Sequence, residues 1–159
     1  MKQLDAMRRF SEYDQKGRYV YALSDLRKIF HEDNETALRA GINRLIKDGI
    51  LVRASNGVFV YALAQSKGSN TLEQIAQTIR RGEYNYVSLE SALSEYGAIS
   101  QILIDRLTVI TTGRSGEFKT PFGTIEFTHT KRSIIDILNN SVEVGRPLRL
   151  ATLNAALRD

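Results

Sequence analysis

The chain has 159 residues, of which 42% are hydrophobic and 25% are charged, a composition that excludes disorder of the whole chain and allows two small domains. The net charge is only +4, and most of the excess lies in residues 1–62, with 11 basic and 8 acidic residues, against 11 and 10 in residues 63–159. There is no cysteine, which excludes disulfides and thiolate metal sites and makes a cytoplasmic protein the simplest expectation.

The N-terminal stretch, MKQLDAMRRF, carries scattered charges rather than a basic stub followed by an apolar run, so we expect no signal peptide. No segment reaches the roughly 18 apolar residues of a membrane span, so no membrane partner is expected either. Instead, apolar residues at helical spacing predict a first helix over residues 2–16, which Gly17 ends.

Shorter elements are expected between Gly17 and Asn34. The stretch RYVYAL is rich in β-branched and aromatic residues, which predicts a strand. Ser24 is expected to cap a short helix over residues 25–30. A polar turn then leads to Asn34, whose side chain is suited to cap the next helix.

That next helix, predicted over residues 35–48, has two different faces when 100° is assigned to each residue. The face expected to pack contains Leu38, Gly41, Ile42 and Leu45. The opposite, polar and cationic face contains Thr36, Arg39, Ala40, Asn43, Arg44 and Lys47. Gly49 is expected to end the helix.

The stretches ILVRAS and VFVYA predict two strands joined across Asn56-Gly57, a dipeptide that tolerates the positive φ values of a tight hairpin. Helix, strand, helix, turn, helix and hairpin is the order of a winged helix-turn-helix. We therefore predict such a domain over residues 1–62, followed by a linker, LAQSKGSN, at residues 63–70.

Residues 71–159 are predicted to form a small mixed α/β domain, which makes the whole chain α+β. We expect a helix over residues 71–81, then a strand and a helix ending at Gly97. Strands are expected at residues 107–112, 117–120 and 124–130, and helices at residues 133–139 and near residue 157. The stretch GRSGE near Gly113 lacks the spacing of a phosphate-binding loop and is interpreted as a hairpin turn.

The cationic helix and the hairpin together favour binding to double-stranded DNA. An α-helix fits the major groove, where planar side chains reach base edges and cations meet phosphates. The candidate contacts are Thr36, Arg39 and Asn43 for base edges, Arg44 and Lys47 for phosphates, and Arg53, Ser55 and Asn56 for the backbone or the minor groove.

Other functions are compatible with the same pattern, because a charged helix face is often only a solvated face. The alternatives are a winged-helix protein-interaction module and a ligand-sensing transcriptional regulator with a pocket in its C-terminal half. The two histidines, His31 and His129, are far apart in sequence, so no metal site is expected. No base, nucleophile and oxyanion set is recognisable, so we expect neither an enzyme nor a cofactor.

The segment YNYVSLESALSEYGAISQ, followed by TVITTGRSGEFKTPFGTIEFTH, resembles the AbiEi-type antitoxins of bacterial type IV toxin-antitoxin systems, which act in abortive infection against phage. In that family a winged helix-turn-helix leads into a domain with short motifs that match Tyr86-Val87-Ser88, Ser91-Ala92-Leu93 and Tyr96-Gly97. PFGTIEF and the closing RPLRLATLNAALRD also look like the family's strand pair and final helical segment.

The resemblance implies a DNA-binding antitoxin that represses its own operon through inverted repeats in the promoter. It also implies opposition to a nucleotidyltransferase-type toxin, which such antitoxins need not hold in a stable complex. An inverted repeat can be filled by a weak dimer or by monomers that bind cooperatively, and both remain open. Many members of the family are longer than this chain.

Overall fold

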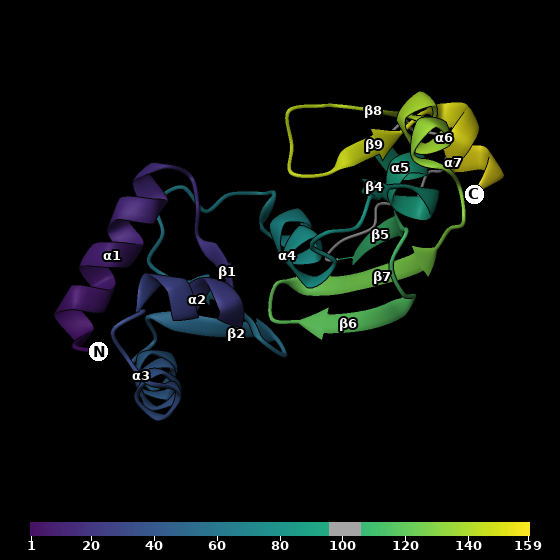
Figure 1. Cartoon of the computed structure of the whole chain (residues 1–159). Coiled ribbons are helices and arrows are strands. Elements are labelled where there is room, and N and C mark those ends of the chain that lie inside the picture. Colours follow the sequence, from purple (N-terminus) through teal and green to yellow (C-terminus); the bar gives the residue numbers. More distant parts are fainter. Residues whose placement is uncertain (96–105) are drawn as a thin grey trace. The chain divides into compact units, whose positions relative to one another are not determined.

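The computed structural model describes residues 1–95 and 106–159, and it combines helices with two separate β-sheets (Figure 1). The expected α+β class is therefore confirmed. The chain divides into two compact units, Met1–Thr71 and Leu72–Asp159.

The first unit contains the helices and strands expected for residues 1–62, in the expected order. They are α1 (Gln3–Gln15), β1 (Val20–Ala22), α2 (Leu23–Ile29), α3 (Glu35–Lys47), β2 (Leu51–Ser55) and β3 (Val58–Tyr61). The strands form an antiparallel sheet in the order β1-β3-β2. The β2–β3 hairpin turns at Asn56-Gly57, where Gly57 has a φ of 72°, as the sequence predicted.

Aromatic rings form the centre of the first unit. Phe10 of α1 is fully buried, and its ring centroid lies 5.2 Å from that of Tyr21, 5.7 Å from Phe30 and 5.3 Å from Tyr61. These neighbours come from β1, the end of α2 and β3. A single side chain of α1 therefore packs against β1, the end of α2 and β3.

The two predicted helix caps have different outcomes. Asn34 caps α3, because its Oδ1 accepts a hydrogen bond of 2.8 Å from the backbone N–H of Ala37. Ser24 does not cap α2, and that prediction was wrong: α2 begins at Leu23, directly after β1. The carboxylate of Asp25 accepts from the N–H of Ala22 instead, at 2.8 Å.

Residues 63–70, expected to be a linker, are bonded to the first unit. The carboxylate of Asp14 in α1 accepts backbone hydrogen bonds from Gln65 at 2.8 Å and from Ser66 at 3.0 Å. Burial acts to raise the pKa of Asp14, but these bonds and one from the Ser66 hydroxyl lower it. The hydroxyls of Tyr19 and Thr71, 2.9 Å apart, close the segment from its other end.

The second unit is built around a mixed six-stranded sheet. In chain order its elements are α4 (Thr71–Ile79), β4 (Asn85–Val87), α5 (Leu89–Glu95), β5 (Arg106–Thr111), β6 (Gly116–Thr120), β7 (Gly123–His129), α6 (Ile134–Asn139), β8 (Ser141–Val142), β9 (Arg149–Ala151) and α7 (Leu153–Arg158). The sheet order is β6-β7-β5-β4-β9-β8. The sequence predicted these elements except β8 and β9.

The connection near Gly113 is not the hairpin turn that the sequence suggested. β7 lies between β5 and β6, parallel to β5 and antiparallel to β6 (Figure 1). The turn at Pro121-Phe122-Gly123 does join paired strands, β6 and β7. The predicted helix end at Gly97 and the Tyr96-Gly97 motif lie outside the described residues.

Two serines of the YVSLESAL segment bond the start of α5 to β5. The backbone N–H of Ser91 donates to the Thr108 hydroxyl at 3.0 Å, and the N–H of Thr108 donates to the Ser91 hydroxyl at 2.8 Å. The Thr108 hydroxyl also donates to the carbonyl of Ser88. These serines therefore have structural partners in the sheet.

A second polar cluster lies around Asp159, whose side chain is only 2% exposed. Its carboxylate accepts from the Ser88 hydroxyl and forms an ion pair of 2.6 Å with Arg132. Arg132 also donates to the Tyr86 hydroxyl at 2.8 Å. Burial, reinforced by the Asp159 carboxylate, raises the pKa of Tyr86 to about 12, so this phenol stays neutral and can accept from Arg132.

Candidate nucleic-acid interface

Helix α3 divides into the two faces that the sequence predicted. Leu38, Gly41, Ile42 and Leu45 are buried, whereas Arg39, Asn43 and Lys47 are exposed. Gly41 packs directly against Met1, because a Cβ built at this position would lie 2.7 Å from Met1 Cγ. The buried face fixes the helix, and the polar face is left to solvent.

The exposed face of α3 meets the β2–β3 hairpin at a small hollow of about 210 Å³, here called the α3–hairpin hollow. α3 contributes Arg39 and Asn43, and the hairpin contributes Arg53 and Asn56. The same hollow is also lined by Leu23, Ile42, Gly57 and Phe59. The structure thus brings together guanidinium and amide groups from two elements that are separate in sequence.

Arg53 is positioned by an aromatic ring. Its guanidinium carbon lies 5.3 Å from the ring centroid of Phe59, across the hairpin on β3. In the β2–β3 pairing Arg53 lies opposite Phe59, and a bulge between Arg53 and Ser55 follows. This cation–π contact limits the conformations of an exposed arginine at the edge of the hollow.

Arg39 is held by the carboxylate of Glu35 at the start of α3. The Arg39 Nε lies 3.0 Å from Glu35 Oε1, and Arg27 of α2 approaches the same carboxylate at 2.9 Å and 3.2 Å. The hydrogen bonds from Arg27, more than those from Arg39, lower the pKa of Glu35. The one acidic side chain at this edge of α3 is therefore shared by two cations.

The other candidate contacts lie outside the hollow. Arg44 donates to the Met1 carbonyl at 2.7 Å, and the Met1 amino group pairs with Asp33 at 3.0 Å, so Arg44 is drawn towards the start of the chain. Thr36 and Lys47 are exposed in the first and last turns of α3, and Ser55 is half-buried at the end of β2. None of these four residues lines the hollow.

Sequence reasoning missed two contributors to this surface. Leu23, the first residue of α2, lines the hollow, and Arg27 reaches Glu35 from the exposed side of α2. The basic pair Arg27-Lys28 is a visible signal in the sequence. Its link to Glu35 is not visible, because it depends on the angle between α2 and α3.

In residues 1–95 and 106–159, no group of three or more histidine, aspartate or glutamate side chains is placed to hold a metal ion. Within the same residues, no helix has the length and apolar character needed to cross a membrane. His31 is exposed in the turn between α2 and α3, and His129 lies at the end of β7.

No protein-family model matches the chain, and no curated protein matches its sequence. The site is therefore interpreted from its own residues.

Proposed function

We propose that the chain is a DNA-binding transcriptional repressor whose first unit is a winged helix-turn-helix. The order α1, β1, α2, α3, β2, β3 and the sheet order β1-β3-β2 support this assignment. In it, α3 follows α2 after a short turn and enters the major groove, and the β2–β3 hairpin is the wing.

The observation that carries the proposal is the α3–hairpin hollow. Arginine is suited to guanine and asparagine to adenine in the major groove, so Arg39 and Asn43 provide both kinds of base contact on adjacent turns of one helix. Arg53 and Asn56 are placed to meet the sugar-phosphate backbone. A solvated helix face alone would not require the hairpin to contribute groups to the same hollow.

The wider biological role rests on the AbiEi resemblance. In this proposal the chain binds inverted repeats in its own promoter, as a weak dimer or as cooperative monomers, and acts as a cytoplasmic type IV antitoxin. The second unit, which contains the family-like segments at residues 86–93 and 121–127, opposes a nucleotidyltransferase-type toxin. We expect the neighbouring reading frame to encode a nucleotidyltransferase, and coexpression of this chain with its product to rescue growth; absence of rescue would contradict that part.

DNA binding is tested with Arg39→Ala and Asn43→Ala and a duplex from the promoter upstream of the gene. Each change should reduce discrimination at one or two base pairs by about 1 to 3 kcal/mol, because it removes a base-edge contact. Fluorescence anisotropy with single base-pair substitutions in the duplex measures this discrimination.

The control is Arg8→Ala, which removes an equal charge from an exposed position on α1 outside the hollow. It should leave base-pair discrimination unchanged. If Arg39→Ala and Asn43→Ala behave like Arg8→Ala on every duplex, α3 does not read DNA. The protein-interaction module then becomes the better explanation of the first unit.

A further inference from the structure

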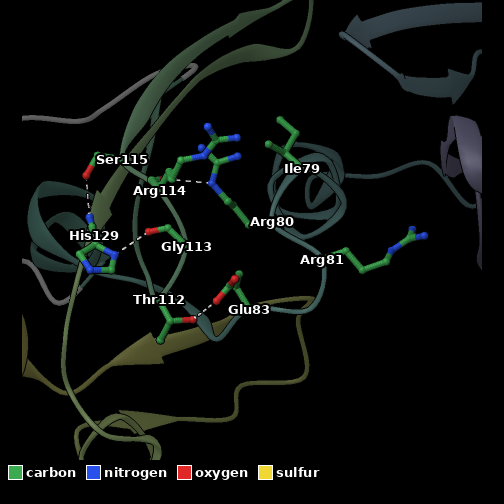
Figure 2. A pocket seen from close by; sticks show the side chains of 9 residues that line it. All are labelled: Ile79, Arg80, Arg81, Glu83, Thr112, Gly113, Arg114, Ser115 and His129. Carbon is green, nitrogen blue, oxygen red and sulfur yellow. Dashed lines mark hydrogen bonds between the residues drawn. The ribbon is translucent and has the colours of Figure 1, made fainter.

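The second unit contains an open pocket of about 610 Å³ whose lining is strongly basic (Figure 2). It lies between the end of α4 with the turn that follows it, the connection from β5 to β6, and the end of β7. The lining contains the basic residues Arg80, Arg81, Arg114 and His129 and a single acidic residue, Glu83. The proposed DNA-binding function does not use this pocket.

Arg80 is fixed in position from two sides. Its Nε donates to the backbone carbonyl of Arg114 at 2.9 Å. Its guanidinium carbon lies 5.1 Å from the ring centroid of Phe118 and 4.6 Å from that of Phe127. A guanidinium held in this way loses little conformational freedom when it binds a ligand.

A second positive charge lies next to Arg80. Burial and, after it, the charge of Arg114 lower the pKa of Arg80. Figure 2 shows the two guanidinium groups directed to the same side of the pocket, whereas Arg81 points away from them. Among the ion pairs of the described residues, none joins Arg80 or Arg114 to a carboxylate.

The carboxylate of Glu83 accepts from the Thr112 hydroxyl at 2.5 Å (Figure 2). Its negative charge acts to raise the pKa of Arg80, but burial and the charge of Arg114 have the larger effects. On the opposite wall, His129 Nδ1 lies 2.7 Å from the carbonyl of Gly113, so Nδ1 carries the hydrogen and donates. The Ser115 hydroxyl accepts from the backbone N–H of His129 at 2.8 Å, which leaves its own hydrogen to donate.

We propose that this pocket binds the phosphate group of a small phosphorylated ligand. Arg80 and Arg114 supply paired guanidinium groups, whose geometry matches phosphate oxygens, and Ser115 supplies a hydroxyl donor. The volume lies within the range of small-molecule sites, about 300 to 1,000 Å³, and leaves room for an organic group beside the phosphate.

The shape of the site favours a small ligand over a nucleic acid. The backbone of a duplex is convex and is usually met by side chains that protrude from the surface. Arg80 is packed on two phenylalanine rings and partly buried in a concave site, so it does not protrude. Inorganic phosphate and a nucleoside monophosphate share the required chemistry and differ in the organic group.

The test is isothermal titration calorimetry on the full chain, with inorganic phosphate in one arm and adenosine monophosphate in the other, at constant ionic strength in chloride. We expect saturable binding. Arg114→Gln should raise the dissociation constant about tenfold or more, because a charge-assisted contact to phosphate is lost. Tighter binding of the nucleotide identifies an organic phosphate as the ligand, and equal affinities identify free phosphate.

Two controls make the result specific. Arg158→Gln removes the same charge from an exposed position on α7 and should leave binding unchanged. Arg39→Ala, in the first unit, should also leave it unchanged, so failure of the DNA-binding proposal does not affect this test. The proposal is overturned if neither phosphate gives saturable heat, or if Arg114→Gln binds like the unmodified chain. A DNA duplex is titrated in the same way. Binding that depends on Arg114 but is seen only with this duplex would also overturn the proposal.

Discussion

Glu35 holds two arginines at the edge of the candidate DNA interface. Its carboxylate contacts Arg27 of α2 and Arg39 of α3, and all three side chains are about half exposed. The site at the start of α3 suits a carboxylate, because free backbone N–H groups give a helix N-terminus a partial positive charge. The same carboxylate would repel a phosphate and competes with DNA for Arg39.

We therefore expect Glu35→Gln to strengthen binding to every duplex by about two- to fivefold at low salt, because one negative charge is removed and Arg39 is released. Fluorescence anisotropy with a specific and a random duplex measures the change. Glu12→Gln, at an exposed position on α1, is the matched control and should have a smaller effect. A loss of affinity in Glu35→Gln would mean that the ion pair orients Arg39 for binding.

At the scale of single residues, the sequence predicted helix faces better than contacts. The regular rotation of a helix places Arg39 and Asn43 on one face, and the structure has them there. The rotation of the helix does not show that Arg53 and Asn56, expected on the hairpin, line the same hollow, because this depends on how the hairpin packs. Nor could it show that Arg44 bonds the Met1 carbonyl, 43 positions away in the chain.

At the scale of elements, α3 depends on its cap. The Asn34 side chain accepts from the N–H of Ala37, one of the donors that the first turn of a helix leaves without a partner. The cap also sets where α3 begins, and hence where Thr36 and Arg39 point. The stability of α3 and the geometry of the proposed interface are therefore coupled.

Asn34→Ala should lower the free energy of unfolding by about 1 kcal/mol, because the cap hydrogen bond is lost without a substitute. Asn34→Ser keeps an acceptor oxygen at the cap and should recover most of this loss. Urea unfolding followed by circular dichroism measures both, with the slope against denaturant expected to stay constant. Equal destabilisation by alanine and serine would show that the cap bond contributes little.

Prediction of elements succeeded where the local signal was strong. The 13 residues of α3 show clear helical periodicity, and Asn56-Gly57 fixes the hairpin. β8 and β9 have two and three residues, too few for a periodic pattern. β9 exists because it pairs in parallel with β4, whose Tyr86 lies opposite Arg149, a contact that no local pattern encodes.

At the scale of the whole molecule, the two cationic features belong to different units. The α3–hairpin hollow is lined only by residues of the first unit, and the basic pocket only by residues of the second. The sequence placed a boundary at residues 63–70. It could not show that this segment bonds to Asp14, because the partners Asp14 and Gln65 are 51 positions apart.

The weak net charge makes salt dependence the decisive measurement for the first unit. A chain of +4 has too little overall charge to attract DNA strongly, so tight binding must come from cations gathered at one surface. On the exposed face of α3 and on the hairpin these are Arg39, Arg44, Lys47 and Arg53. If about three or four phosphates are neutralised, the logarithm of the association constant should fall with the logarithm of salt with a slope of about −3.

Binding to the promoter duplex should therefore weaken roughly fifty- to a hundredfold between about 50 and 200 mM salt. Lys47→Ala should weaken specific and random duplexes alike and reduce the steepness of the slope by about 1, because one phosphate contact is lost. Arg8→Ala, on α1, should keep the original slope. A slope near zero in the unmodified chain would contradict phosphate neutralisation. The exposed face of α3 would then be assigned to a protein partner, because binding to a protein releases no counterions from DNA.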